Sequence, residues 1–172
     1  MPIKILIMDT AIDNVFPPRE PKPKWLRVKL PTGKNYTELR GLVDKYKLNT
    51  ICTSGSCPHM GECWGEGTAT FMILGNICTR SCGFCGVKTG RPEDVDWDEP
   101  EKVARSIKIM NIKHAVITSV DRDDLKDMGS IIWAETVKAI RRMNPNTTLE
   151  TLIPDFQGNT RNLDRIIEVA PE

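Results

Sequence analysis

The sequence predicts an α/β fold in which parallel strands alternate with helices. Three apolar runs of strand length occupy residues 70–77, 115–119 and 149–153, and each is followed by a segment whose apolar residues recur at helical spacing. Short connections join these elements, and their order indicates a parallel sheet built from right-handed crossovers. Because three strands cannot close a barrel, we expect only the first three β/α units of a larger domain.

The composition argues against a polyanionic or membrane partner. In 172 residues, 24 basic and 23 acidic side chains give a formal net charge of +1. The two signs are intermixed, so no charge field favours nucleic acid or a lipid surface. Residues 1–15 do not follow the pattern of a secretory or transit peptide, and no apolar run approaches the roughly 20 residues of a spanning helix. We therefore expect a cytoplasmic protein, where clustered cysteines hold metal or do redox chemistry more often than they form disulfides.

The first 50 residues are predicted to form an N-terminal arm and one short helix. Residues 16–32 include five prolines among basic side chains, a composition typical of extended backbone. The apolar residues of 25–30 alternate, so this part of the arm is expected to lie against a surface. Residues 36–46 then carry apolar side chains at helical spacing and predict an amphipathic helix weakened by Gly41.

Residues 51–69 contain the first of two cysteine groups. Cys52, Cys57 and Cys63 have the spacing C-x4-C-x5-C in a segment rich in Gly, Ser and Pro. This composition predicts a loop, too irregular for helix or strand, that wraps backbone around a ligand.

Residues 70–172 form the predicted β/α part and contain the second cysteine group. Cys78, Cys82 and Cys85 have the spacing C-x3-C-x2-C and begin at the end of the first predicted strand. This is the strand end at which β/α folds place their cofactors.

Start and stop signals mark the three helices expected to accompany these strands. Asp98 and Glu101 form a D-x-x-E capping box with Pro100 in the first turn. Ser130 is expected to cap the second helix, and Pro171 to end the third. The third helix is expected to turn four side chains inward, Leu163, Ile166, Ile167 and Ala170.

Thiolates are soft ligands that select iron–sulfur clusters, Zn or Cu(I). A structural zinc site takes four ligands, usually as two close pairs, whereas each group here has three cysteines. His59, between Cys57 and Cys63, is the nearby candidate for a fourth ligand, and His114 reads as an ordinary packed or solvated histidine. Three ligands on a four-iron cluster would leave one iron open to bind another molecule.

The segment from Cys78 to Cys85, with Phe84 just before the third cysteine, resembles the motif of the radical S-adenosylmethionine (SAM) enzymes. The resemblance implies a partial radical SAM (β/α) barrel and a [4Fe-4S] cluster whose open iron chelates the methionine part of SAM. Electron transfer would then cleave SAM to a 5′-deoxyadenosyl radical that abstracts hydrogen. By the same resemblance Phe84, Arg122 and Asp123 belong to the SAM pocket, and there is no catalytic residue beyond the clusters.

The upstream stretch CTSGSCPHMGECW resembles the auxiliary-cluster motif of the lipoyl synthases, and the likeness extends over residues 25–158. It implies insertion of two sulfur atoms into an octanoyl chain on a carrier-protein lysine, with a second [4Fe-4S] cluster, on Cys52, Cys57 and Cys63, consumed as sulfur donor. The implied carrier is glycine cleavage H protein or a 2-oxoacid dehydrogenase E2 lipoyl domain. Flavodoxin or ferredoxin would supply electrons, and an iron–sulfur carrier would reload the cluster.

The chain departs from the lipoyl synthase pattern in two places. Met128 stands where the family usually has glycine, which affects the local backbone. The family's further strands and late serine, the fourth ligand of the auxiliary cluster, have no counterpart before Glu172. We therefore expect the chain alone to be weakly active or inactive.

Three other interpretations remain. The chain could be a non-catalytic zinc or Fe–S module. It could also be another sulfur-inserting radical SAM enzyme, such as a methylthio-transferring enzyme or biotin synthase, but these lack the upstream cysteine pattern. Disulfide pairing of the six cysteines is the weakest reading. Trp64 and Trp97 could line a cavity, although large aromatic side chains more often serve packing.

Overall fold

The computed structural model describes residues 33–46, 49–54 and 57–169, together with residues 21 and 23. The predicted surface contact of residues 25–30 therefore lies outside the described residues. Ala170, predicted to face inward, and Pro171, predicted to end the last helix, also lie outside the described residues.

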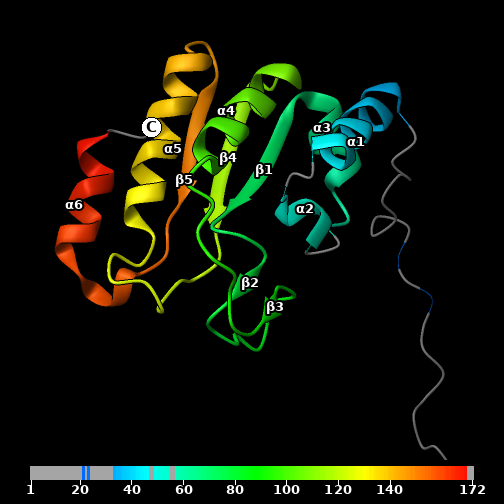
Figure 1. Cartoon of the computed structure of the whole chain (residues 1–172). Coiled ribbons are helices and arrows are strands. Elements are labelled where there is room, and N and C mark those ends of the chain that lie inside the picture. Colours follow the sequence, from blue (N-terminus) through cyan, green and yellow to red (C-terminus); the bar gives the residue numbers. More distant parts are fainter. Residues whose placement is uncertain (1–20, 22, 24–32, 47–48, 55–56, 170–172) are drawn as a thin grey trace, which may run out of the picture.

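A three-stranded parallel sheet forms the centre of the molecule (Figure 1). Its strands are β1 (Thr68–Ile73), β4 (His114–Ser119) and β5 (Thr148–Leu152), in the order β1-β4-β5. The register aligns the strand ends, and Ile73 lies beside Ser119. The predicted α/β class with parallel strands is thereby confirmed, and the carboxyl ends of the strands meet at one edge of the sheet.

Three helices follow the strands as the pattern predicts. They are α4 (Glu99–Ile109), α5 (Ser130–Met143) and α6 (Thr160–Glu168), and α5 lies between the other two (Figure 1). The apolar face of α5 buries Trp133 and Val137 almost completely. Burial of such side chains, which removes apolar surface from water, is the main stabilising contribution to this layer.

Three further helices lie on the β1 side of the sheet, where two of them contact β1 and the first packs on the third. Two of the three were expected to be irregular loop. The three helices are α1 (Lys34–Tyr46), which is predicted, and α2 (Ile51–Ser54) and α3 (Met60–Glu66), which are not. The glycine-rich composition of α3 is overridden by packing, because Trp64 is 1% exposed and lies 5.6 Å from Tyr36 between ring centroids. Gly67, at φ 84°, ends the helix and donates its N–H to the carbonyls of the last turn.

The first strand is shorter at its carboxyl end than its apolar run predicts. It stops at Ile73 because Leu74 and Gly75 take the left-handed conformation, with φ of 67° and 93°. Residues 76–90 then leave the sheet as a separate loop, in which β2 (Ile77–Cys78) pairs in parallel with β3 (Lys88–Thr89). The second cysteine group thus begins beyond a turn and not at the end of the strand.

Both predicted side-chain caps are wrong. Asp98 makes no capping bond, and its own N–H is bound by Asp96 at 3.0 Å, while Glu99 reaches Leu74. Ser130 is the first residue of α5 and donates its hydroxyl to Asn162 at 3.0 Å. These polar groups have partners on other elements, and contacts of this kind take precedence over local capping patterns.

The inward face predicted for α6 is only partly correct. Ile166 is buried, but Leu163 is 39% and Ile167 is 61% exposed. In the sheet, β5 is an edge strand of the described residues, and its Leu152 is also exposed. These three apolar side chains are therefore partly open to solvent in the described part of the chain. None of the described helices combines the length and the apolar composition of a membrane span.

Candidate functional site

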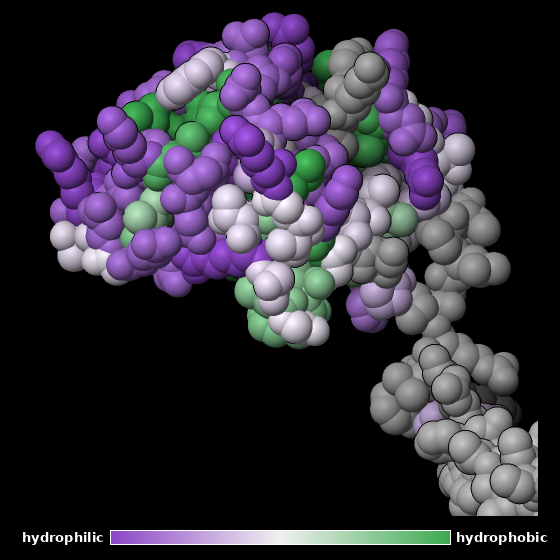
Figure 2. All heavy atoms as spheres, turned by 60° about the horizontal axis from the view of Figure 1, so that its bottom comes forward, coloured by the Kyte–Doolittle hydropathy of each residue, from purple (hydrophilic) through white to green (hydrophobic). Residues whose placement is uncertain are grey.

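The second cysteine group lies on the loop that projects from the carboxyl edge of the sheet. Cys78 is half-buried at the base of this loop, whereas Cys82 and Cys85 are exposed and Phe84 is 95% exposed. Figure 2 looks toward this end of the molecule and shows the loop in white to pale green among mostly hydrophilic surroundings. None of the three thiols is in a disulfide.

The base of the loop is bonded to the segment that follows β4. The sulfur of Cys78 accepts the backbone N–H of Arg80 at 3.4 Å and of Asp121 at 3.3 Å. The N–H of Thr79 reaches the carbonyl of Asp121 at 3.1 Å. N–H donors directed at a cysteine sulfur orient it and tune any metal that it binds.

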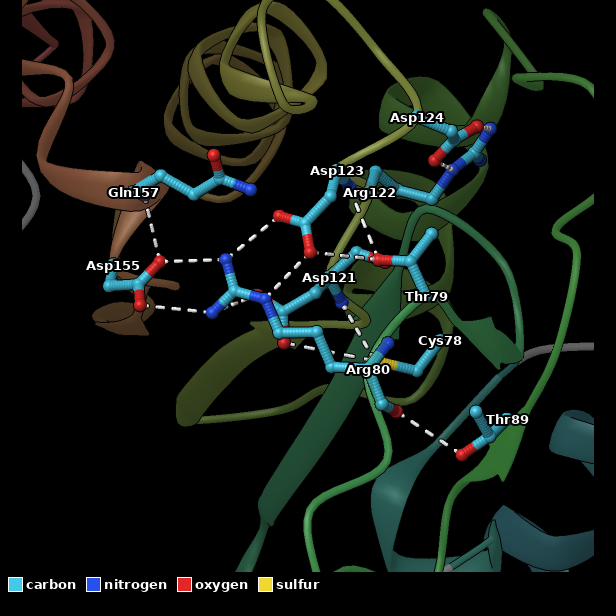
Figure 3. Close-up of polar contacts among 10 residues, drawn as sticks. All are labelled: Cys78, Thr79, Arg80, Thr89, Asp121, Arg122, Asp123, Asp124, Asp155 and Gln157. Atoms are coloured by element: carbon cyan, nitrogen blue, oxygen red, sulfur yellow. Dashed lines mark hydrogen bonds and ion pairs between the residues drawn. The ribbon is translucent and has the colours of Figure 1, made fainter.

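Arg80 connects this loop to the ends of two other strands (Figure 3). Its guanidinium binds the carboxylate of Asp123 through Nε at 2.7 Å and Nη2 at 2.8 Å. A second pair of bonds, both 2.9 Å, joins it to Asp155 after β5. Asp121 lies 3.6 Å away. Three strand ends therefore meet at one side chain, through the bidentate geometry that arginine makes best.

These contacts lower the pKa of two of the acidic groups. The hydrogen bonds from Arg80 hold the pKa of Asp123 down at about 2, and they also lower the pKa of Asp155. The pKa of Arg80 is correspondingly raised. The cluster of Arg80 with Asp121, Asp123 and Asp155 thus holds one positive and up to three negative charges beside the cysteine loop.

Arg122 and Asp123, both predicted for the SAM pocket, have different surroundings. The side chain of Arg122 is 3% exposed and forms two bonds of 2.9 and 2.8 Å with Asp124. It also donates to the carbonyl of Leu74 at 3.4 Å. Figure 3 shows this pair apart from the contacts of Arg80. Arg122 therefore supports the turn after β1, whereas Asp123 belongs to the group around Arg80.

The turn after β1 is held from three sides. Glu99 of α4 accepts the N–H of Leu74 at 2.7 Å, and burial of its carboxyl group raises its pKa. Arg122 binds the carbonyl of the same residue. The Cα of Gly129 faces its side chain so closely that a β-carbon added there would lie 2.3 Å from a methyl of Leu74. The direction in which the cysteine loop leaves the sheet depends on these contacts.

The first cysteine group lines one apolar cavity of about 380 Å³ beside β1. Cys52 is buried, and Cys57 and Cys63 are half-buried. Burial raises the pKa of Cys63, and the neighbouring Cys52 and Cys57 raise it further. The three thiols therefore share one space. His59 is exposed, 3.6 Å from Glu62. Trp64 is packed in the core and Trp97 is 67% exposed.

Both groups fit an iron–sulfur cluster by the chemistry of their donors. Among the described residues, no three His, Cys, Asp or Glu side chains are gathered closely enough to hold a single metal ion. A cluster carries its thiolates on separate irons and so holds them farther apart than one ion does. Free soft thiols in two sets of three, one in an apolar cavity and one supported by N–H donors, are donors that such clusters take.

Sequence reasoning missed Arg80, Asp155 and Glu99 as residues that arrange the site. Arg80 stands inside the cysteine motif, so its position was a visible signal. Its partners Asp123 and Asp155 lie 43 and 75 residues away, and no local pattern connects them.

Comparison with known proteins gives a consistent result. The sequence model of the Radical SAM superfamily matches residues 72–170. A protein of Nematostella vectensis named "Lipoyl synthase, mitochondrial" is 94% identical over 165 residues, which are 96% of this chain and 57% of that protein. A lipoyl synthase of Christiangramia forsetii is 90% identical over 90% of the chain and 53% of its own length. A lipoyl synthase of Karelsulcia muelleri is 62% identical over 88% of the chain and 52% of its own length. The chain thus spans about half the length of these relatives.

Proposed function

Because this chain belongs to the radical SAM superfamily, we propose that it provides the cluster-binding part of a lipoyl synthase. Such an enzyme inserts two sulfur atoms at unactivated carbons of an octanoyl chain carried on a protein lysine. Similarity to proteins of that name, up to 94% identical, supports the proposal. The observation that carries it is the division of six thiols into two groups, one on a projecting loop and one in an apolar cavity.

Cys78, Cys82 and Cys85 would hold the SAM-binding [4Fe-4S] cluster. Together with SAM this cluster supplies radical chemistry, which the reaction needs because the carbons attacked carry no acidic proton. Phe84 and Asp123 remain proposed residues of the SAM pocket: Phe84 lies on the cysteine loop, and Asp123 follows β4 and binds Arg80 of that loop. For Arg122 we propose an indirect role, because its buried side chain supports Leu74.

Cys52, Cys57 and Cys63 would hold the second [4Fe-4S] cluster, the source of the inserted sulfur. The apolar lining of their cavity, which includes Ile51 and Met60, suits the neighbourhood of an alkyl chain. In this scheme residues 1–50 are an arm with a short helix, 51–69 the auxiliary-cluster segment, and 70–172 the incomplete radical SAM barrel. An octanoylated lipoyl-carrier domain, a flavodoxin- or ferredoxin-type electron donor and an iron–sulfur carrier for reloading complete it.

Metal analysis after anaerobic reconstitution tests the proposal. The wild-type chain is expected to bind about eight irons and eight sulfides, four for each cluster. Replacing Cys78, Cys82 and Cys85 by alanine should remove half of the iron, and replacing the other three cysteines should remove the other half. Stoichiometric zinc without sulfide would support a zinc module and contradict the proposal.

An activity measurement separates the possible sulfur-inserting reactions. The substrate is a lipoyl-carrier domain bearing an octanoyl group, incubated with SAM and a reductant. Because the 172-residue chain is expected to be weakly active or inactive, slow cleavage of SAM that depends on Cys78, with traces of a sulfur-containing octanoyl product that depend on Cys52, would support lipoyl synthase chemistry. Full turnover by this chain would refute the expectation of weak activity. If the loaded chain cleaves SAM and transfers a methylthio group instead, the proposed reaction is wrong.

A further inference from the structure

Arg80 lies within the cysteine motif but is bonded almost entirely to residues outside it. Four hydrogen bonds of 2.7–2.9 Å join its guanidinium to Asp123 after β4 and to Asp155 after β5. Only 28% of the side chain is exposed, so these bonds are partly shielded from water. A planar guanidinium that serves two carboxylates at once fixes both the distance and the angle between them.

The β5–α6 turn that supplies Asp155 is itself strained. Phe156, Gln157 and Gly158 have consecutive φ values of 45°, 50° and 74°, and two of these residues are not glycine. Asp155 accepts the N–H of Gln157 at 2.9 Å with the same carboxylate that binds Arg80. A hydrogen bond from the side chain of Gln157 also lowers the pKa of Asp123. Such a turn persists only when its surroundings hold it in place.

We propose that Arg80 is a positioning residue that couples the cysteine loop to the β5–α6 turn, so that each holds the other in its observed conformation. The coupling passes through Asp123 and Asp155 and needs no bound cofactor. It rests on the proposed function only where the cysteine loop is taken to carry a cluster. The loop is thus supported by three strands and not only by the chain on either side of it.

Amide hydrogen exchange on the cofactor-free 172-residue chain tests the coupling. The probes are the N–H groups of Thr79 and Gly90 in the loop and of Gln157 and Gly158 in the turn, all of which are hydrogen bonded. In Arg80→Ala we expect these four N–H groups to exchange about tenfold faster, because the charge-assisted hydrogen bonds to two carboxylates are lost. Buried amides of β4 should keep their rates.

Reciprocity makes the test sharper. Asp155→Asn, made 75 residues from Arg80, is expected to speed exchange at Thr79 about threefold, a smaller effect because Asp155 is 64% exposed. The matched control is Arg142→Ala, which removes an arginine–carboxylate pair with Glu101 between α4 and α5. This control should leave all four probes within twofold. If the loop amides accelerate in Arg80→Ala while Gln157 and Gly158 do not, or if Asp155→Asn leaves Thr79 unchanged, the coupling is refuted.

The reduction potential of the reconstituted cluster on the loop gives a second, independent readout. Arg80→Ala removes a positive charge beside Cys78 and should shift the midpoint potential downward, whereas Arg80→Lys keeps the charge and should keep the potential while still loosening the loop. An unchanged potential in Arg80→Ala would contradict a role for Arg80 at the cluster. If no cluster forms in the wild-type chain, the proposed function fails, and the exchange experiment still decides the coupling.

Discussion

Replacing Gly129 by alanine tests whether the turn after β1 is as tightly held as the structure indicates. Gly129 has φ of 80°, a conformation that costs a residue with a β-carbon about 1 kcal/mol. The added methyl would lie 2.3, 3.0 and 3.3 Å from the end of the Leu74 side chain. Leu74 is 3% exposed, and its N–H and carbonyl are bound by Glu99 and Arg122, so it has little room to move.

Overpacking of this kind typically costs about 1–3 kcal/mol. Together with the backbone cost, we expect Gly129→Ala to lower the free energy of unfolding by about 2–4 kcal/mol. The measurement is a urea titration followed by circular dichroism, with the m-value checked for two-state behaviour.

Gly41→Ala is the matched control in the same chain. Gly41 lies inside α1, and a β-carbon there would meet nothing within 4 Å. Alanine at this position should stabilise the chain by about 0.5–1 kcal/mol. A loss of less than about 1 kcal/mol in Gly129→Ala would show that Leu74 relaxes freely, and the close packing inferred for the turn would then be wrong.

Three further predictions concern the same framework. Met128→Gly should raise the free energy of unfolding by up to about 1 kcal/mol, measured in urea, because Met128 has φ of 51°; an unchanged value would mean that its side-chain packing offsets the strain. Burial raises the pKa of Glu99, so its protonated form favours folding, and stability from this group is present below pH 4.5 and lost as pH rises through the raised pKa. Glu99→Gln should therefore gain stability relative to wild type between pH 4 and pH 7, and a pH-independent difference would refute this. Trp64→Ala should cost about 3–5 kcal/mol in thermal or chemical unfolding, whereas Trp97→Ala should cost less than about 0.5 kcal/mol; equal losses would contradict the burial of Trp64.

The sequence predicted those features that local periodicity encodes. The strands β4 and β5 and the buried face of α5 follow from apolar spacing, because the apolar side chains of each element pack on a single side into the core. The end of β1 was missed, since the positive φ of Leu74 leaves no trace in an apolar run that continues to Ile77. Helix α3 was missed because its stability comes from the burial of Trp64 and not from its composition.

Site residues divide in the same way. The two cysteine groups are visible in the spacing, and the radical SAM family that this spacing suggests is the one whose sequence model matches the chain. Their role as cluster ligands stays a prediction. The different surroundings of Arg122 and Asp123 could not be read, because they are adjacent in the chain and face different partners. Arg80 was overlooked for the opposite reason, since its partners are distant in sequence and meet it only after three strands have paired.

The short pairing of β2 with β3 closes the cysteine loop at its base. Cys78 lies at the closed base of the loop, where its carbonyl accepts the N–H of Gly90 at 3.0 Å, and Cys82 and Cys85 lie within the loop. The chain entropy lost in joining the two ends is therefore lost on folding and not when a cofactor binds. Inserting residues between Cys85 and Lys88 is expected to weaken cofactor binding much less than breaking the β2–β3 pairing at Thr89, because loop entropy grows only slowly with length.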